Sequence, residues 1–96
     1  MKHTSKVKGF EGTTHELATQ VGDLFYDSMA EFLNQLADKI QLDGEADFNR
    51  GRKKLANELF ESSQHLRSAA NNISNAWDIC SPFVDEWLEK HGIKRP

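Results

Sequence analysis

Acidic side chains in the middle of the sequence are the first candidates for chemistry. Carboxylates on facing helices can hold Mg²⁺ or a pair of metal ions, and a histidine can join such a centre. The candidates for this role are Asp27, Glu31, Glu58, Glu61 and His65. If level residues of a helical hairpin have numbers that add to about 89 or 90, the four carboxylates lie near its middle and His65 lies close by. This grouping suggests a Mg²⁺- or Mn²⁺-dependent hydrolase.

One spacing is similar to a motif of helical pyrophosphohydrolases, which pair Glu-x-x-Glu with Glu-x-x-Asp. The sequence has Glu58-x-x-Glu61, but Glu86-x-x-Glu89 stands where the second motif would need an aspartate. The heptad phase also turns Glu61 outward, away from the predicted helix contact. We therefore favour a solvated charged face and predict no catalytic residue, metal or cofactor. The metal-dependent hydrolase remains the alternative.

A dense basic cluster occupies residues 50–54, with the sequence Arg-Gly-Arg-Lys-Lys. Such a cluster can grip phosphate, so nucleic-acid contact through Arg50, Lys53 and Lys54 is a second alternative. Acidic residues near the same end of the hairpin offer a simpler account: Asp38, Asp43, Glu45 and Asp47. Arg52 could pair with Asp38 across the hairpin. We favour local ion pairs over nucleic-acid binding.

The element that must position these groups is a long helix over residues 47–80. Its residues at alternating steps of four and three form a heptad seam, which is typical of a helix packed lengthwise on another. The seam consists of Phe48, Arg52, Leu55, Leu59, Ser62, Leu66, Ala69, Ile73, Ala76 and Cys80. A helix of this length needs a partner along its whole length to be stable.

The partner is a first helix predicted over residues 14–42. Thr13 and Glu16 fit a capping box at its start, and a wide apolar band follows. The segment 43–47 predicts the turn, in which Gly44 takes the left-handed conformation that ends a helix. So short a connection makes the two helices antiparallel.

A short third helix is predicted over residues 82–91. Ser81 is a good N-cap, Pro82 a good first helical residue, and Gly92 a stop signal at which Ile93 can pack back. Residues 1–12 predict a flexible arm and residues 94–96 a frayed tail. Residues 13–93 then form a single helical domain.

Composition limits the class of protein. The 96 residues carry a net charge of −3 and contain one cysteine, Cys80, so no disulfide can form within the chain. We expect a cytoplasmic protein on this basis, because the basic N-terminus is not followed by the apolar segment of a secretory signal. No apolar run approaches 18 residues, so we expect no membrane partner.

These observations predict an all-α fold, a long antiparallel helical hairpin with a short C-terminal helix. The first helix has more apolar surface than one neighbour can cover, and Phe60 lies off the seam, so we expect a homodimer that forms a four-helix bundle. The expected function is that of a small interaction or regulatory protein with a further, unidentified protein partner. The expected packing and interface residues are Leu55, Leu59, Leu66, Ile73, Trp77, Phe25, Phe32 and Leu36.

Overall fold

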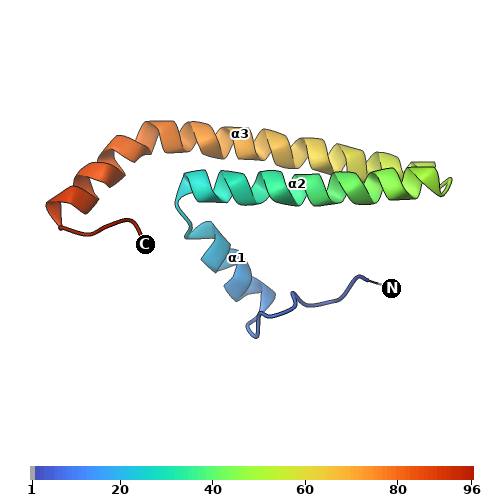
Figure 1. The fold of residues 1–96 in the computed structure, drawn as a ribbon, viewed down its shortest axis with the longest axis horizontal. Helices are drawn as coiled ribbons and strands as arrows, with labels where there is room; N and C mark the ends of the chain where they lie inside the picture. Colours follow the sequence, from blue (N-terminus) through green and yellow to red (C-terminus); the bar gives the residue numbers. More distant parts are fainter. Residues whose placement is uncertain (1) are drawn as a thin grey trace.

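A computed structural model describes residues 2–96 and contains three helices with no strand among them. The helices are α1 (Thr14–Gly22), α2 (Tyr26–Asn49) and α3 (Lys53–Lys90). Helices α2 and α3 lie antiparallel along most of their length, and α1 diverges from the start of α2 (Figure 1). The predicted all-α fold and the hairpin are thus confirmed. Residues 2–12 form no helix, and Met1 of the predicted arm lies outside the described residues.

Small residues form the contact between α2 and α3. The buried residues of each helix are spaced seven apart: Ala30, Ala37 and Gly44 on α2, and Ala56, Ser63 and Ala70 on α3. Short side chains at heptad spacing let two backbones approach closely. The Ser63 hydroxyl donates a hydrogen bond of 3.0 Å to the carbonyl oxygen of Ala37, directly across this contact.

The turn lies at residues 50–52, and its prediction at 43–47 is wrong. Gly51 has φ +82°, the Gly51 N–H donates to the Phe48 carbonyl, and the Arg52 N–H donates to the Asp47 carbonyl. This pair of bonds is the Schellman motif that ends helices at glycine. Gly44 instead lies inside α2, where a Cβ would come within 2.6 Å of the Phe60 ring. Its lack of a side chain serves packing rather than the turn.

The displaced turn changes the register of the hairpin. Phe25 contacts Trp77, Ala37 contacts Ser63, and Asp38 pairs with Arg67. Level residues therefore have numbers that add to about 102 rather than to 89 or 90. Every cross-helix pair expected from the earlier register is wrong by nearly two heptads.

The first predicted helix, 14–42, is in fact two helices separated by residues 23–25. The capping box is confirmed, because the Glu16 N–H donates to the Thr13 hydroxyl and Glu16 accepts from the Thr13 N–H. The chain leaves helical geometry at Phe25, which has φ −53° and ψ 144°. The Phe25 ring packs edge-on against Trp77 with centroids 6.0 Å apart, and this contact holds the break at the open end of the hairpin.

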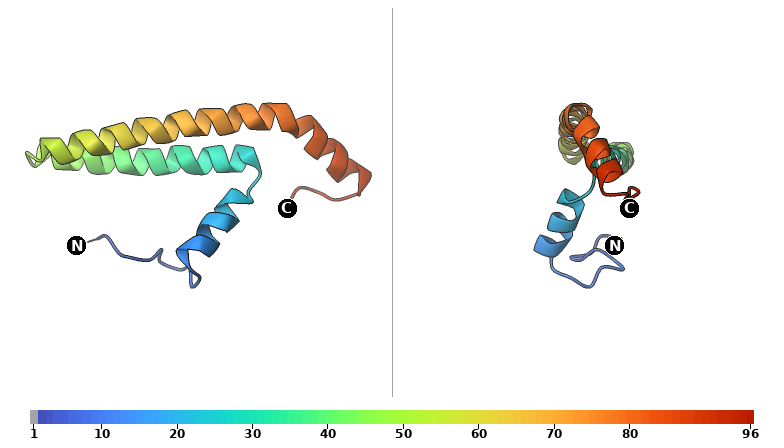
Figure 2. Two further views of the ribbon diagram at one scale, coloured as in Figure 1. Left: turned by 180° about the vertical axis from the view of Figure 1, so that it is seen from behind. Right: turned by 90° about the vertical axis from the view of Figure 1, so that its left-hand side faces the viewer.

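Helix α3 begins at Lys53 rather than at residue 47 and continues through Pro82, so the two helices expected on either side of this proline are one. Pro82 lacks an N–H, which leaves the Asp78 carbonyl without its helical donor, and both residues are exposed to water. The last part of α3 bends toward the side of the hairpin on which α1 lies (Figures 1 and 2), as a proline within a helix predicts. The predicted stop at Gly92 is confirmed, because Gly92 and Ile93 donate to the carbonyls of Glu89 and Leu88.

The molecule is elongated, with extents of 57 × 30 × 17 Å and a radius of gyration of 17.0 Å. A compact chain of this length would have a radius of gyration of about 12.5 Å. Helix α1 extends away from the hairpin rather than lying along it (Figure 2). One side of the hairpin is consequently open along much of its length.

Candidate interaction surface

The open side of the hairpin carries most of its large apolar residues. On α2 they lie to one side of the contact line Ala30–Ala37–Gly44, and on α3 to one side of Ala56–Ser63–Ala70. Because the helices run antiparallel, these two flanks fall on the same side of the hairpin. We call this surface the apolar face, and it comprises Met29, Phe32, Leu33, Leu36, Ile40, Leu55, Leu59, Leu66 and Ile73.

The apolar face is only partly covered. Phe32, Leu36 and Leu55 are 44%, 37% and 47% exposed, and the remaining residues of the face are half-buried. Helix α1 turns Leu17 and Val21 toward the start of the face, across a cavity of about 410 Å³. Leu36 lies further along α2, outside this cavity, whereas Leu55 lies at the turn end of the face.

The opposite side of the hairpin is polar. A shallow groove of about 520 Å³ runs along it, and its lining side chains are mostly carboxylates, amides and hydroxyls: Asp27, Glu31, Asn34, Gln35, Arg67, Asn71 and Ser74, with Ala30 and Ala70 at its base. Over residues 27–35 and 67–74 the hairpin is thus amphipathic, with one face suited to apolar contact and one suited to water.

The expected packing residues occupy two environments. Leu59, Leu66, Ile73 and Trp77 are half-buried beside the contact line, whereas Leu55 is exposed. The line of closest contact runs one position further along α3, through Ala56, Ser63 and Ala70. Phe32 and Leu36 lie on the same side of the hairpin as the α3 leucines, and Phe25 packs against Trp77 at the open end. Phe60, which was expected to be in surplus, instead lies over Gly44 within the hairpin.

The structure does not bring the acidic candidates together. With the turn at residues 50–52, Glu58 and Glu61 lie near the closed end, while Asp27 and Glu31 lie near the open end. Asp27 pairs with Arg95, and Glu31 accepts a hydrogen bond of 3.1 Å from Gln35. His65 is exposed on α3, and residues 2–96 contain no group of three His, Cys, Asp or Glu side chains that could hold a metal ion.

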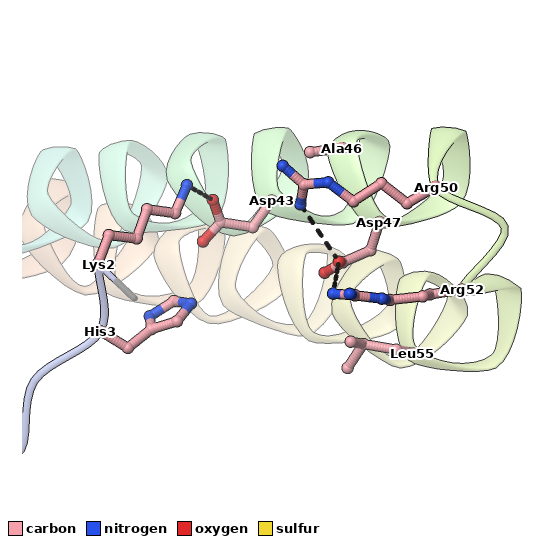
Figure 3. Close-up of a pocket in the computed structure, with 8 residues that line it drawn as sticks. All are labelled: Lys2, His3, Asp43, Ala46, Asp47, Arg50, Arg52 and Leu55. Atoms are coloured by element: carbon pink, nitrogen blue, oxygen red, sulfur yellow. Dashed lines mark hydrogen bonds and ion pairs between the residues drawn. The ribbon is translucent and has the colours of Figure 1, made fainter.

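The basic cluster is engaged in local contacts. Arg50 and Arg52 lie 3.7 and 3.5 Å from the same oxygen of Asp47 (Figure 3), and Lys53 lies over the Phe48 ring at 5.4 Å. The expected pair between Arg52 and Asp38 is wrong, because Asp38 accepts from Arg67 at 2.7 Å. Lys54 is exposed.

A second acidic residue ties the N-terminal arm to the same end of the hairpin. Lys39 donates to both oxygens of Asp43, at 2.7 and 2.6 Å, and Lys2 donates to one of them at 3.3 Å. The bond from Lys39 is the main reason why the pKa of Asp43 lies below its ordinary value. Lys2, Asp43, Asp47 and Leu55 line one cavity of about 580 Å³ (Figure 3), at the turn end of the apolar face.

At the open end, Arg95 forms a contact that the sequence did not reveal. Its guanidinium donates to both carboxylate oxygens of Asp27, one bond being 2.7 Å, and to the Ser28 hydroxyl at 3.0 Å. The guanidinium carbon lies 4.4 Å from the Phe25 ring centre and 5.1 Å from that of Trp77. The partners are 68 residues apart, so no local pattern could indicate them.

The Asp27–Arg95 pair makes the stability of the fold depend on pH at acidic values. The Arg95 bond holds the pKa of Asp27 below the 3.8 of an unperturbed aspartate. A carboxyl with a lowered pKa stabilises the fold above its unfolded pKa and loses that contribution as the pH falls through its folded pKa. We expect the Asp27 titration midpoint, followed by carboxyl ¹³C NMR, to lie below 3.8 and to rise toward 3.8 in Arg95→Ala. The Asp43 midpoint is the control and should not move. Equal Asp27 midpoints in the two proteins would contradict the pairing.

Two broader findings bear on the class of protein. None of the helices in residues 2–96 combines the length and apolar character that crossing a bilayer requires. Comparison of the chain with protein families, with curated proteins and with solved structures yielded no significant match.

Proposed function

We propose that this chain is a small helical interaction module that acts as a homodimer. The apolar face of one hairpin would pack on the same face of a second copy, so that four long helices form a bundle. One observation carries the proposal. Among residues 2–96 the largest fully buried side chain is that of Ser63, although the sequence contains six phenylalanines and two tryptophans.

The amount of exposed surface supports a dimer. The chain exposes 7725 Å², whereas a compact monomer of 10.9 kDa would expose about 5,600 Å². The difference is about 2,100 Å² per chain, and obligate homodimers bury roughly 2,000–5,000 Å² in total over both chains. A second copy can therefore account for the surplus.

The distribution of charge favours a second copy over an unrelated partner. Asp43 and Asp47 are already paired with cations of the same chain, so the turn end of the face carries charges of both signs. A face with an apolar middle and both signs of charge at its end can meet its own copy, as a two-fold symmetric interface requires. The polar groove on the other side stays free for a further protein partner. The proposal includes a cytosolic location, which rests on the single cysteine, Cys80.

The solution mass tests this proposal. Light scattering should give twice the 10.9 kDa of one chain, and the urea unfolding midpoint should rise with protein concentration, because unfolding is then coupled to dissociation. The mass of a single chain over about a hundredfold range of concentration, with a constant midpoint, would overturn the dimer. In that case α1 or another protein would have to cover the apolar face.

A further inference from the structure

The site around Arg95 has the parts of a receptor for an arginine side chain. Asp27 and Ser28 meet the edge of the guanidinium with three hydrogen bonds, and the guanidinium carbon lies over the rings of Phe25 and Trp77. A guanidinium is recognised by these two kinds of contact, a carboxylate that takes two of its N–H groups and aromatic faces that attract its charge.

The receptor is built on the hairpin rather than on the tail. Asp27 and Ser28 belong to the first turn of α2, and the Ser28 N–H donates to Asp27 at 2.8 Å, which fixes the orientation of the carboxylate. Trp77 belongs to α3 and packs edge-on against Phe25 at 6.0 Å. Asp27, Phe25 and Trp77 therefore each have a partner on the hairpin other than Arg95.

The C-terminal segment, residues 93–96, is in contrast bound to α2 through one side chain, that of Arg95. Gly92 has φ +62°, and from there residues 93–96 return toward α2 outside any helix. Lys94 and Pro96 are exposed, and Ile93 is 47% exposed. The Arg95 side chain is itself 37% exposed. Since the segment after Gly92 is anchored mainly through Arg95, it can leave without disturbing the hairpin.

We propose that Phe25, Asp27, Ser28 and Trp77 form an arginine-binding site that Arg95 fills within the isolated chain. When the tail detaches, the site accepts an arginine-bearing segment of another polypeptide. The tail is then an intramolecular competitor. Its effective concentration at the site is on the order of millimolar for a short flexible link, and an arginine from another chain must compete with it at that concentration. The site lies at the open end of the hairpin, away from the turn.

A peptide that copies the tail tests the site. The full-length Arg95→Ala chain, labelled with ¹⁵N, keeps the receptor and lacks its internal ligand. We expect acetyl-Gly-Ile-Lys-Arg-Pro-amide to shift the Trp77 indole and Ser28 amide signals in a saturable way. Its dissociation constant should be on the order of a millimolar, because one side chain makes the contact. The unsubstituted chain should bind the peptide at least about twofold more weakly, because Arg95 competes at a similar effective concentration.

Matched controls separate recognition from general binding. The same peptide with alanine in place of arginine should give no saturable shift, and the lysine peptide should bind at least about fivefold more weakly, since lysine lacks the planar fork. Asp27→Asn in the Arg95→Ala background should abolish the response while circular dichroism remains unchanged. No saturable shift with the arginine peptide, or an equal shift with the alanine peptide or with Asp27→Asn, would overturn the proposal.

A mixing experiment distinguishes the source of the arginine. The unlabelled full-length Asp27→Asn chain has a free Arg95 but no carboxylate to hold it. If this chain shifts the Trp77 signal of labelled Arg95→Ala, a second copy supplies the arginine by exchanging tails. If only the peptide does so, the site is open to segments of other proteins. If neither acts, the site is not an exchangeable receptor.

Discussion

Replacing Ser63 by leucine is expected to destabilise the hairpin by about 3 kcal/mol. Ser63 is fully buried where α3 meets α2, and its hydroxyl bonds to the Ala37 carbonyl. The substitution removes a hydrogen bond worth about 1 kcal/mol and forces a larger side chain into a contact built for small ones, which typically costs about 1–3 kcal/mol. Urea unfolding followed by circular dichroism measures the loss.

Ser68→Leu is the matched control, because Ser68 lies on the same helix and is exposed. The substitution should change the free energy of unfolding by less than about 0.5 kcal/mol, and leucine is a slightly better helix former than serine. If Ser63→Leu were as stable as Ser68→Leu, the close approach of α2 and α3 would be wrong.

Leu36→Asp is expected to split the proposed dimer into folded monomers. Leu36 is already 37% exposed in one chain, so an aspartate there does little harm to a single hairpin. In the dimer the same carboxylate would be buried without a partner, at a cost of about 3 kcal/mol or more. The dissociation constant of the dimer should therefore rise more than about a hundredfold. Light scattering gives the mass, and circular dichroism gives the helix content.

Leu42→Asp is the control for that experiment. Leu42 lies on α2, is 62% exposed, and is about 120° around the helix from Leu36, away from the apolar face. It should leave the mass unchanged. A dimer that survives Leu36→Asp, or that Leu42→Asp breaks equally well, would place the interface elsewhere.

Local signals in the sequence predicted what is local in the structure. The capping box at Thr13 and Glu16 and the helix stop at Gly92 are both present. Each depends on residues within a few positions of one another, so the sequence suffices. The long heptad pattern also identified α3 as a helix that packs along a partner.

The position of the turn could not be decided locally. Gly44 and Gly51 both lie among polar residues, and either could end a helix. The choice depends on which register pairs Ala30, Ala37 and Gly44 with the small residues of α3, and that pairing is a property of both helices together. Once the turn was misplaced, the acidic candidates were wrongly grouped at the middle of the hairpin.

Pro82 misled in a different way. Its sequence context, Ser81 before it and acids after it, fits a helix start, but the same features are tolerated on the exposed side of a bent helix. The Arg95 site could not be predicted from the sequence, because Arg95 and Asp27 are separated by nearly the whole hairpin and no spacing rule links them.

The three-residue connection at Gly51 has a consequence for how the molecule assembles. The contact between Gly44 and Phe60 links residues close in sequence, whereas those of Ala37 with Ser63 and Phe25 with Trp77 span progressively longer stretches. Closing a longer loop costs more entropy, so we expect the two helices to zip from Gly51 outward. The aromatic end with its bound arginine then forms last, and in thermal fluctuations it opens first.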